Sequence, residues 1–322
     1  MSNNIILSVR NLKTFFPQEG KELRAVNGIS FDMKKGKTVC LVGESGCGKS
    51  MTALSIMGLV PSPGRVVEGT IMYKNINLLD RKKNLWKYRG KDISMIFQDP
   101  MTSLNPVMKV GRQISEGFMI HDAQMTKAEA KNRSIEMLRM VHIPEPETRY
   151  DEYPHQMSGG MRQRVMIAMA LACRPEILIC DEPTTALDVT VQAQIMKLIV
   201  ELQGEIGMSV LLITHDMGVV SEMADEIYVL YAGRVVEIAD REEMFQRQLH
   251  PYSESLLKAI PKIGNKNSAL YSIPGMVPKL TEDIQGCIFY ERCSYKTDTC
   301  AKNQPTLKEI NGKRKVACFR YE

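Results

Sequence analysis

Hydrophobic residues occur in short runs separated by polar turns along the first hundred positions, a pattern typical of β-strands. The early runs lead into an apolar segment without polar interruptions, so we expect antiparallel strands before a buried one. Phe15 and Phe16 lie between the first two runs, where aromatic rings are suited either to stack on a planar ring or to pack beneath a hairpin. The predicted strands are Ile5–Val9, Ala25–Phe31, Thr38–Val42, Gly69–Tyr73 and Ile93–Phe97.

The pattern becomes helical from about residue 100 to residue 172. Thr126 and Glu129 have the spacing of a capping box, which marks the beginning of an α-helix. Ile135, Leu138 and Val141 recur on one face of that helix. A second long helical run follows residues 158–160 and reaches residue 173, so we predict a helical subdomain over this part of the chain.

Strands and helices alternate after the helical subdomain. An apolar strand, Ile177–Cys180, ends at Asp181, and a helix is predicted over Gln192–Leu202. The next apolar strand, Val210–Thr214, precedes His215. Alternation of this kind predicts an α/β fold with a mostly parallel sheet, whose ligands bind at the carboxyl ends of the strands.

Composition is ordinary for a globular protein, at 44% hydrophobic and 25% charged residues in 322. That length suggests two or three folding units. The net charge is +5, without a long basic block that would indicate nucleic-acid binding. No apolar run approaches the roughly 18 residues of a membrane helix, and the beginning does not resemble a signal peptide. We therefore expect a cytoplasmic protein, with any membrane role supplied by partner subunits.

A complete phosphate-loop motif, G-x-x-x-x-G-K-S, lies between the third predicted strand and a predicted helix over Ser50–Leu59. Its glycines allow backbone N–H groups to surround phosphate oxygens, and the helix N-terminus attracts negative charge. Lys49 is expected to reach the β- and γ-phosphates, and the Ser50 hydroxyl to bind Mg²⁺. The motif predicts nucleoside triphosphate binding by Gly43, Ser45, Gly46, Cys47, Gly48, Lys49, Ser50 and Met51.

Three further residues have the chemistry that nucleotide hydrolysis requires. Asp181, at the end of an apolar strand, suits a second Mg²⁺-holding position. Glu182 is placed to polarise the attacking water, although a carboxylate there can also cap a turn. His215 follows a strand and could donate a hydrogen bond to the γ-phosphate, although a single histidine is more often structural.

Cys47, inside the phosphate loop, leaves two interpretations open. If the thiol is accessible, alkylation should block nucleotide binding and bound nucleotide should protect it. Alternatively, cysteine is a tolerated small residue at this position.

The order of motifs resembles that of ATP-binding-cassette ATPases over roughly residues 5–250. The resemblance implies ATP as substrate and a head-to-tail pair of cassettes, with ATP between one phosphate loop and the partner's Ser-Gly-Gly signature. It implies that Gln98 contacts Mg²⁺ or water, that Asp188 connects the two sites and that Phe15 stacks on adenine. The residues that carry it are Gly43–Ser50, Gln98, Ser158, Gly159, Gly160, Ile177–Glu182, Ala186–Asp188 and His215.

The signature departs from the family's usual Leu-Ser-Gly-Gly-Gln at both ends. Met157 replaces the leucine and Met161 replaces the glutamine. Methionine cannot make the hydrogen bonds of a glutamine side chain, so we do not expect that contact here. The hydroxyl of Ser158 and the backbone N–H groups of Gly159 and Gly160 are retained.

Three segments resemble the corresponding segments in the ATPase subunits of dipeptide and oligopeptide importers, and nickel and opine importers share this pattern. The segments are Tyr153–Gln156, Met161–Ala170 and His250–Ser253. This resemblance implies two membrane permease subunits, an extracytoplasmic solute-binding protein and a second ATPase, a relative in preference to a copy. The expected location is the cytoplasmic face of a bacterial or archaeal membrane. A non-transport ATPase on DNA or ribosomes is the alternative, but the chain has one cassette and no strongly basic face.

Four of the eight cysteines lie in the last 36 residues: Cys287, Cys293, Cys300 and Cys318. Four thiolates can hold Zn²⁺ or an iron–sulfur cluster, and the spacing lacks the C-x-x-C pairs of common zinc sites. Similar tails in peptide-importer ATPases carry a [4Fe–4S] cluster, which the resemblance implies here. Unliganded thiols or a redox sensor are the alternatives. We thus predict a nucleotide-binding domain, 1–260, with a helical subdomain at about 100–172, and a cysteine-rich extension, 261–322.

Overall fold

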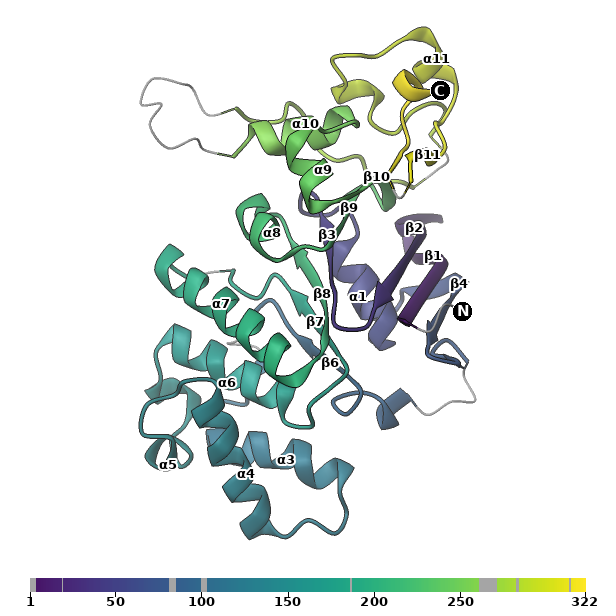
Figure 1. Cartoon of the computed structure of the whole chain (residues 1–322). Helices are drawn as coiled ribbons and strands as arrows, with labels where there is room; N and C mark the ends of the chain where they lie inside the picture. The colour runs from purple at the N-terminus through teal and green to yellow at the C-terminus, as the bar shows by residue number, and fades with distance from the viewer. Residues whose placement is uncertain are drawn as a thin grey trace. The chain divides into compact units, whose positions relative to one another are not determined.

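The computed structural model describes residues 4–18, 20–80, 85–99, 103–185, 187–260, 271–281, 284–312 and 314–322. The chain forms two compact units (Figure 1). The first unit comprises Met1–Lys34, Thr38–Asp80 and Ile213–Glu322, and the second comprises Lys35–Lys37 and Arg81–Leu212. Both have the strands and helices of an α/β protein.

An antiparallel sheet in the first unit begins the chain. Residues 6–9, Leu12 and Thr14 of its first strand are buried, while Arg10 and Lys13 form ion pairs with neighbouring strands. The antiparallel prediction is confirmed, and the first strand is longer than predicted, so Phe15 and Phe16 lie inside it. Bulges at Val9–Leu12 and Thr14–Phe15 interrupt the regular register of this strand with β2. The order is β2-β1-β4-β5, with β1 Ile5–Gln18, β2 Lys21–Lys34, β4 Arg65–Tyr73 and β5 Ile76–Asn77.

A mixed sheet contains the strand before the phosphate loop. β3, Thr38–Val42, is buried throughout and pairs in parallel with β9, Glu226–Tyr231. This parallel pairing agrees with the prediction, whereas the pairings from β9 through β10, Arg234–Asp240, to a hairpin near the end of the chain are antiparallel, so the sheet as a whole is mixed. That hairpin is β11, Lys308–Asn311, and β12, Arg314–Val316; the helices of the core are α1 Lys49–Met57, α8 Met217–Met223, α9 Arg241–Gln246 and α10 Pro251–Lys258.

The described part of the second unit combines strands of the mixed sheet with a group of helices. β6, Ile93–Ile96, pairs in parallel with β7, Ile177–Asp181, and β7 also neighbours β8, Ser209–Thr214, which ends in the first unit. The predicted capping box is present, since Thr126 Oγ1 accepts from Glu129 N and Glu129 Oε2 accepts from Thr126 N. Helices occupy much of residues 103–172, residues 100–102 lie outside the described ranges, and the bounds of the helical subdomain stay a prediction. The helices are α3 Val110–His121, α4 Lys127–Met140, α5 Pro146–Arg149, α6 Gly159–Leu171 and α7 Val189–Ile206, with 3₁₀ turns η1 Leu85–Lys87 and η2 Pro154–Gln156.

The last part of the chain, predicted as a cysteine-rich extension, belongs to the first unit and is held there by side-chain contacts. Arg314 of β12 forms an ion pair of 3.0 Å with Glu237 of β10, whose side chain is completely buried. Phe289 packs against the rings of Tyr231 and Tyr252. The predicted boundary at residue 260 adjoins residues 261–270, which lie outside the described ranges, and it stays a prediction. The short elements of the extension are η3 Tyr290–Arg292, α11 Asp298–Lys302 and η4 Phe319–Tyr321.

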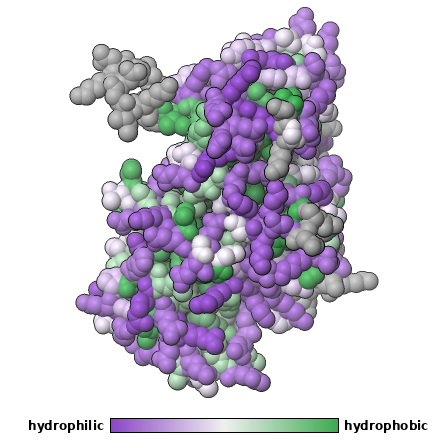
Figure 2. Space-filling model, in the orientation of Figure 1, coloured by the Kyte–Doolittle hydropathy of each residue, from purple (hydrophilic) through white to green (hydrophobic). Residues whose placement is uncertain are grey.

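The face drawn in Figure 2 is mostly hydrophilic, and its hydrophobic residues form small separate patches. Among the residues that the structure describes, none of the helices has the length and apolar character needed to cross a membrane.

Candidate functional site

The phosphate loop has a backbone that only glycine permits at two positions. Gly43 has φ +151°, and a Cβ there would lie 2.3 Å from the Leu230 carbonyl oxygen. Gly48 has φ +99°, and a Cβ there would lie 2.3 Å from the Ala25 carbonyl oxygen. α1 begins directly after Gly48 without a side-chain cap, so the helix N-terminus is suited to an anion.

Lys49 is folded back onto the loop. Its Nζ donates hydrogen bonds to the carbonyl oxygens of Gly43, at 2.7 Å, and Glu44, at 3.1 Å. Lys49 is only 4% exposed. The ammonium group is therefore already inside the loop that the sequence assigned to phosphates. Ser50 and Met51 follow in the first turn of α1, both half-buried.

The thiol of Cys47 is completely buried. Burial raises its pKa, and this effect exceeds the opposing attraction of the Lys49 charge. A buried, protonated thiol reacts slowly with alkylating reagents. The structure thus contradicts the interpretation that Cys47 is accessible and favours the tolerated small residue.

An open pocket of about 1040 Å³ in the first unit brings His215 together with the phosphate loop. His215 precedes Asp216, the N-cap of α8, whose Oδ1 accepts a hydrogen bond from Gly218 N at 2.8 Å. Arg24, which the sequence did not single out, also lines the pocket, and its guanidinium lies 5.7 Å from the centre of the Phe15 ring. The lining from the core is Leu23, Arg24, Ala25, Gly43, Glu44, Ser45, Gly46, His215 and Asp216.

Glu182 lies in the second unit at a strained position. Its φ of +46° is in the left-handed region, which a non-glycine residue adopts at a cost and which is often found at active sites. Its Oε2 accepts a hydrogen bond of 3.0 Å from Gln98 Nε2 and one of 3.2 Å from Thr185 Oγ1. Asp181 precedes it as the last residue of β7 and is 5% exposed. Three predicted residues, Gln98, Asp181 and Glu182, thus lie at this position. Thr185 also contacts Glu182, although the sequence did not single it out.

The Ser-Gly-Gly turn is presented at the beginning of α6. Ser158 is the N-cap, and its Oγ accepts from Met161 N at 3.3 Å. Ser158 and Gly159 are exposed, whereas Met157 is 3% exposed and belongs to the core. Methionine replaces leucine in a core at little cost, which accounts for the first departure from the usual signature. Met161 is half-buried.

Asp188, also in the second unit, is exposed and caps α7. Its Oδ1 accepts from Val191 N at 3.0 Å. This cap is the role that the structure gives it, and its predicted link between two nucleotide sites stays a prediction.

The four cysteines of the extension line one pocket of about 330 Å³. Burial raises the pKa of the thiols of Cys293 and Cys318, and raises that of Cys287 to about 11. No three His, Cys, Asp or Glu side chains in the described ranges come close enough together to hold one metal ion. The four predicted ligands thus line the same pocket. Within the described ranges, they are not close enough together to bind a single metal ion.

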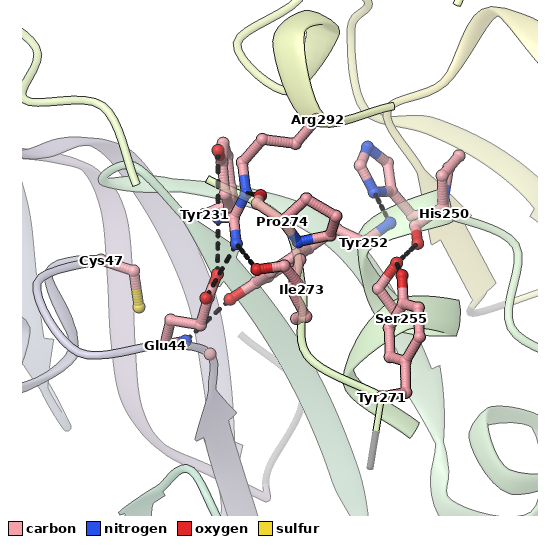
Figure 3. Close-up of polar contacts among 12 residues, drawn as sticks. Glu44, Cys47, Tyr231, His250, Tyr252, Ser255, Tyr271, Ile273, Pro274 and Arg292 are labelled. Atoms are coloured by element: carbon pink, nitrogen blue, oxygen red, sulfur yellow. Dashed lines mark hydrogen bonds and ion pairs between the residues drawn. The ribbon is translucent and has the colours of Figure 1, made fainter. Parts of the chain in front are cut away.

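Glu44, Tyr252 and Arg292 form a polar cluster beside the phosphate loop that sequence analysis missed (Figure 3). Glu44 N donates to the Tyr252 hydroxyl at 2.7 Å, and Arg292 forms an ion pair with the Glu44 carboxylate. Arg292 and Glu44 are 248 positions apart, and neither belongs to a motif position with an assigned role. The one available signal was the position of Arg292 beside a predicted ligand, Cys293.

Comparison with known proteins identifies the family. Residues 26–185 match the ABC transporter family model, and residues 236–300 match the family of the oligopeptide/dipeptide transporter C-terminal region. The chain is 50% identical to the probable peptide ABC transporter ATP-binding protein y4tR of Sinorhizobium fredii, covering 98% of this chain and 95% of that one. It is also 50% identical to the oligopeptide transport ATP-binding protein AppD of Bacillus subtilis, covering 98% and 97%.

A solved structure supports the same assignment. The dimeric, post-hydrolysis ATP-binding cassette MJ0796, bound to ADP and Pi, is 29% identical with a TM-score of 0.65, covering 73% of this chain and 98% of that one. The order of motifs, the phosphate loop and the two family matches agree. The chain belongs to the ABC transporter family, among the ATP-binding proteins that carry the oligopeptide/dipeptide transporter C-terminal region.

Proposed function

We propose that the chain is the ATPase subunit of a peptide importer and that its ATP hydrolysis drives uptake through separate membrane subunits. The observation that carries this proposal is the buried Glu182, held by Gln98 directly after a strand, in a chain that also has a complete phosphate loop. A carboxylate fixed in this way is suited to polarise water for attack on a phosphate. The peptide cargo rests on the similarity to peptide transport proteins along nearly the whole chain.

In the first unit, the phosphate loop binds the triphosphate. Lys49 already has its ammonium inside the loop, so exchanging its carbonyl partners for phosphate oxygens requires only a small movement. Ser50, next in α1, supplies the hydroxyl for Mg²⁺. His215 shares a pocket with the loop and donates to the γ-phosphate. Phe15 and Arg24 form the side on which the adenine ring stacks.

In the second unit, Glu182 acts on the attacking water. Its hydrogen bonds from Gln98 and Thr185 fix the orientation of the carboxylate. Asp181 would hold Mg²⁺ as the second protein group after Ser50. The Gln98 amide that contacts Glu182 would also contact the metal ion or the water.

Two such ATPases pair head to tail, and the exposed Ser158-Gly159-Gly160 turn of one binds the nucleotide of the other. Ser158 supplies a hydroxyl, and the glycines supply backbone N–H groups at the beginning of α6. Asp188 connects the two sites. The second ATPase is a relative of this chain, and two membrane permeases and an extracytoplasmic binding protein complete the importer at the cytoplasmic face of a bacterial or archaeal membrane.

Exchange of Glu182 for glutamine tests the function. In cells that carry Glu182→Gln in place of the parent chain, we expect ATP binding to persist while ATP hydrolysis and uptake of labelled di- and pentapeptides are lost. Glu201→Gln, an exposed carboxylate on α7, is the matched control and should retain both. Labelled Ni²⁺ in a parallel assay tests the main alternative cargo. Normal hydrolysis by Glu182→Gln would remove the proposed role, and uptake of Ni²⁺ alone would remove the peptide assignment.

We also infer that the extension holds a [4Fe–4S] cluster. The support is the donor set itself, four thiols around one pocket of about 330 Å³ in a segment with few large apolar residues. Bound to its thiolates, such a cluster would stabilise the fold of the extension. Anaerobically purified protein should contain iron and acid-labile sulfide in equal amounts, and Cys293→Ser or Cys300→Ser should lose both, while Cys173→Ser retains them. Zinc, or no metal at all, in the parent protein would refute the cluster.

A further inference from the structure

Arg292 of the extension forms a bidentate ion pair with Glu44 of the phosphate loop. Its Nη1 donates to Glu44 Oε2 at 2.7 Å, and its Nη2 donates to Glu44 Oε1 at 2.9 Å (Figure 3). The arginine side chain is only 4% exposed, so water competes little for the guanidinium. Charge-assisted bidentate pairs are strong and fix the relative orientation of the two groups.

The guanidinium is itself held by other segments of the first unit. Its Nε donates to the Pro274 carbonyl at 2.7 Å, and its Nη1 donates to the Tyr231 hydroxyl at 3.4 Å. Its Nη2 also lies 3.5 Å from the Ile273 carbonyl. Because β9 and residues 273–274 both fix the arginine, it offers Glu44 a defined partner and not a mobile surface charge.

Glu44 is also held through its main chain. Its N–H donates to the Tyr252 hydroxyl at 2.7 Å, and its carbonyl oxygen accepts from Lys49 Nζ at 3.1 Å. Tyr252 is completely buried, with its ring packed against Tyr231 at 4.7 Å between centroids. Glu44 is therefore hydrogen-bonded to Arg292 of the extension, to the buried Tyr252 and to Lys49, the lysine that is expected to bind the phosphates.

We propose that Arg292 is a positioning residue for nucleotide binding, holding the phosphate loop through Glu44 in the conformation that receives a triphosphate. Holding the loop before binding reduces the conformational entropy that is lost when the ligand binds. Arg292 contacts the loop and not the nucleotide, so it acts on ATP affinity and not on the chemical step. The inference rests on the proposed nucleotide binding alone and does not depend on the cargo.

Variants of the full-length chain test this role through equilibrium binding of a fluorescent ATP analogue. Arg292→Gln and Glu44→Gln should each raise Kd about tenfold, and the double variant should raise it no further, because both changes remove one interaction. Arg292→Lys keeps the charge without the paired donors and should give an intermediate Kd. Lys302→Gln, an exposed cation of the same extension, should bind like the parent. At saturating ATP, kcat of the assembled importer should change less than about twofold in Arg292→Gln.

An unchanged Kd in a folded Arg292→Gln chain would overturn the proposal, and so would additive effects of the two single changes. If Arg292→Gln does not fold, Glu44→Gln decides the matter, since it removes the charge of the carboxylate that Arg292 binds. A raised Kd in Glu44→Gln with an unchanged melting temperature supports positioning of the loop, and a parental Kd contradicts it. Loss of uptake with parental Kd values throughout would leave the ATPase function standing and the positioning role refuted.

Discussion

The amide of Gln98 and the carboxylate of Glu182 are joined by a hydrogen bond of 3.0 Å from Nε2 to Oε2. The two residues follow β6 and β7, which are paired in parallel, so the sheet brings together positions that are 84 residues apart. The left-handed φ of Glu182 turns the chain directly after the strand. Gln98 therefore holds the Glu182 carboxylate directly, and its removal should change the orientation of that carboxylate.

Replacing Gln98 by alanine should therefore lower hydrolysis without preventing nucleotide binding. Loss of the donor leaves Glu182 less well oriented toward water, and we expect kcat to fall about ten- to a hundredfold. The Kd for ATP should stay within about threefold of the parent, since Lys49 and the loop glycines are untouched. Steady-state phosphate release and analogue binding measure the two quantities. Gln124→Ala, an exposed glutamine between α3 and α4, is the control, and a parental kcat in Gln98→Ala would contradict the assignment.

Much of this site is predictable because its motifs are local. The phosphate loop joins a buried strand to a helix within a few residues, and the capping box at Thr126 has a fixed spacing, so periodicity and turn chemistry suffice. The length of β1 was not predictable in the same way. Its bulges shift the register with β2, and the ion pairs of charged residues such as Arg10 and Lys13 require neighbouring strands.

Contacts across long sequence separations could not be predicted. Arg292 meets Glu44 only because the end of the chain folds back beside the phosphate loop within the first unit, and a single arginine in a polar segment carries no periodic or motif signal. The same applies to the completely buried Glu237, which ends in an ion pair with Arg314 of a hairpin that sequence analysis did not expect. The contacts of such residues are determined by tertiary packing, about which the sequence patterns of helices and strands give no information.

Cys47 should resist alkylation in the native chain. Its side chain is completely buried, and burial raises the pKa of the thiol, so little thiolate is present at neutral pH. We expect N-ethylmaleimide to modify Cys47 at least about tenfold more slowly in native protein than in urea. Peptide mass spectrometry of timed samples gives the rate at each cysteine, with the half-buried Cys173 as an internal comparison. Rapid modification of Cys47 in the native chain would mean that the loop opens in solution.

Acid should destabilise the native chain through His250. This residue is 2% exposed, caps α10 and accepts a hydrogen bond from Tyr252 N at Nδ1, at 3.1 Å. Burial lowers its pKa from 6.5 to about 3, so it stays neutral in the native state. Between these pH values the unfolded chain binds the extra proton, and a falling pH therefore favours unfolding. The contribution is complete above about pH 6.5 and is lost at about 1.4 kcal/mol per pH unit below it.

His250→Asn provides the measurement, because asparagine retains an acceptor for Tyr252 N but has no proton to gain. From urea unfolding at pH 7 and pH 5, we expect the parent to lose about 2 kcal/mol more stability than this variant. His155→Asn, an exposed histidine on the second unit, should keep the parental pH dependence. Equal losses in the parent and His250→Asn would show that the imidazole accepts a proton without unfolding. That result would require a native structure in which water or an acidic group reaches His250, and not the closed contact with Phe289 and Tyr252 seen here.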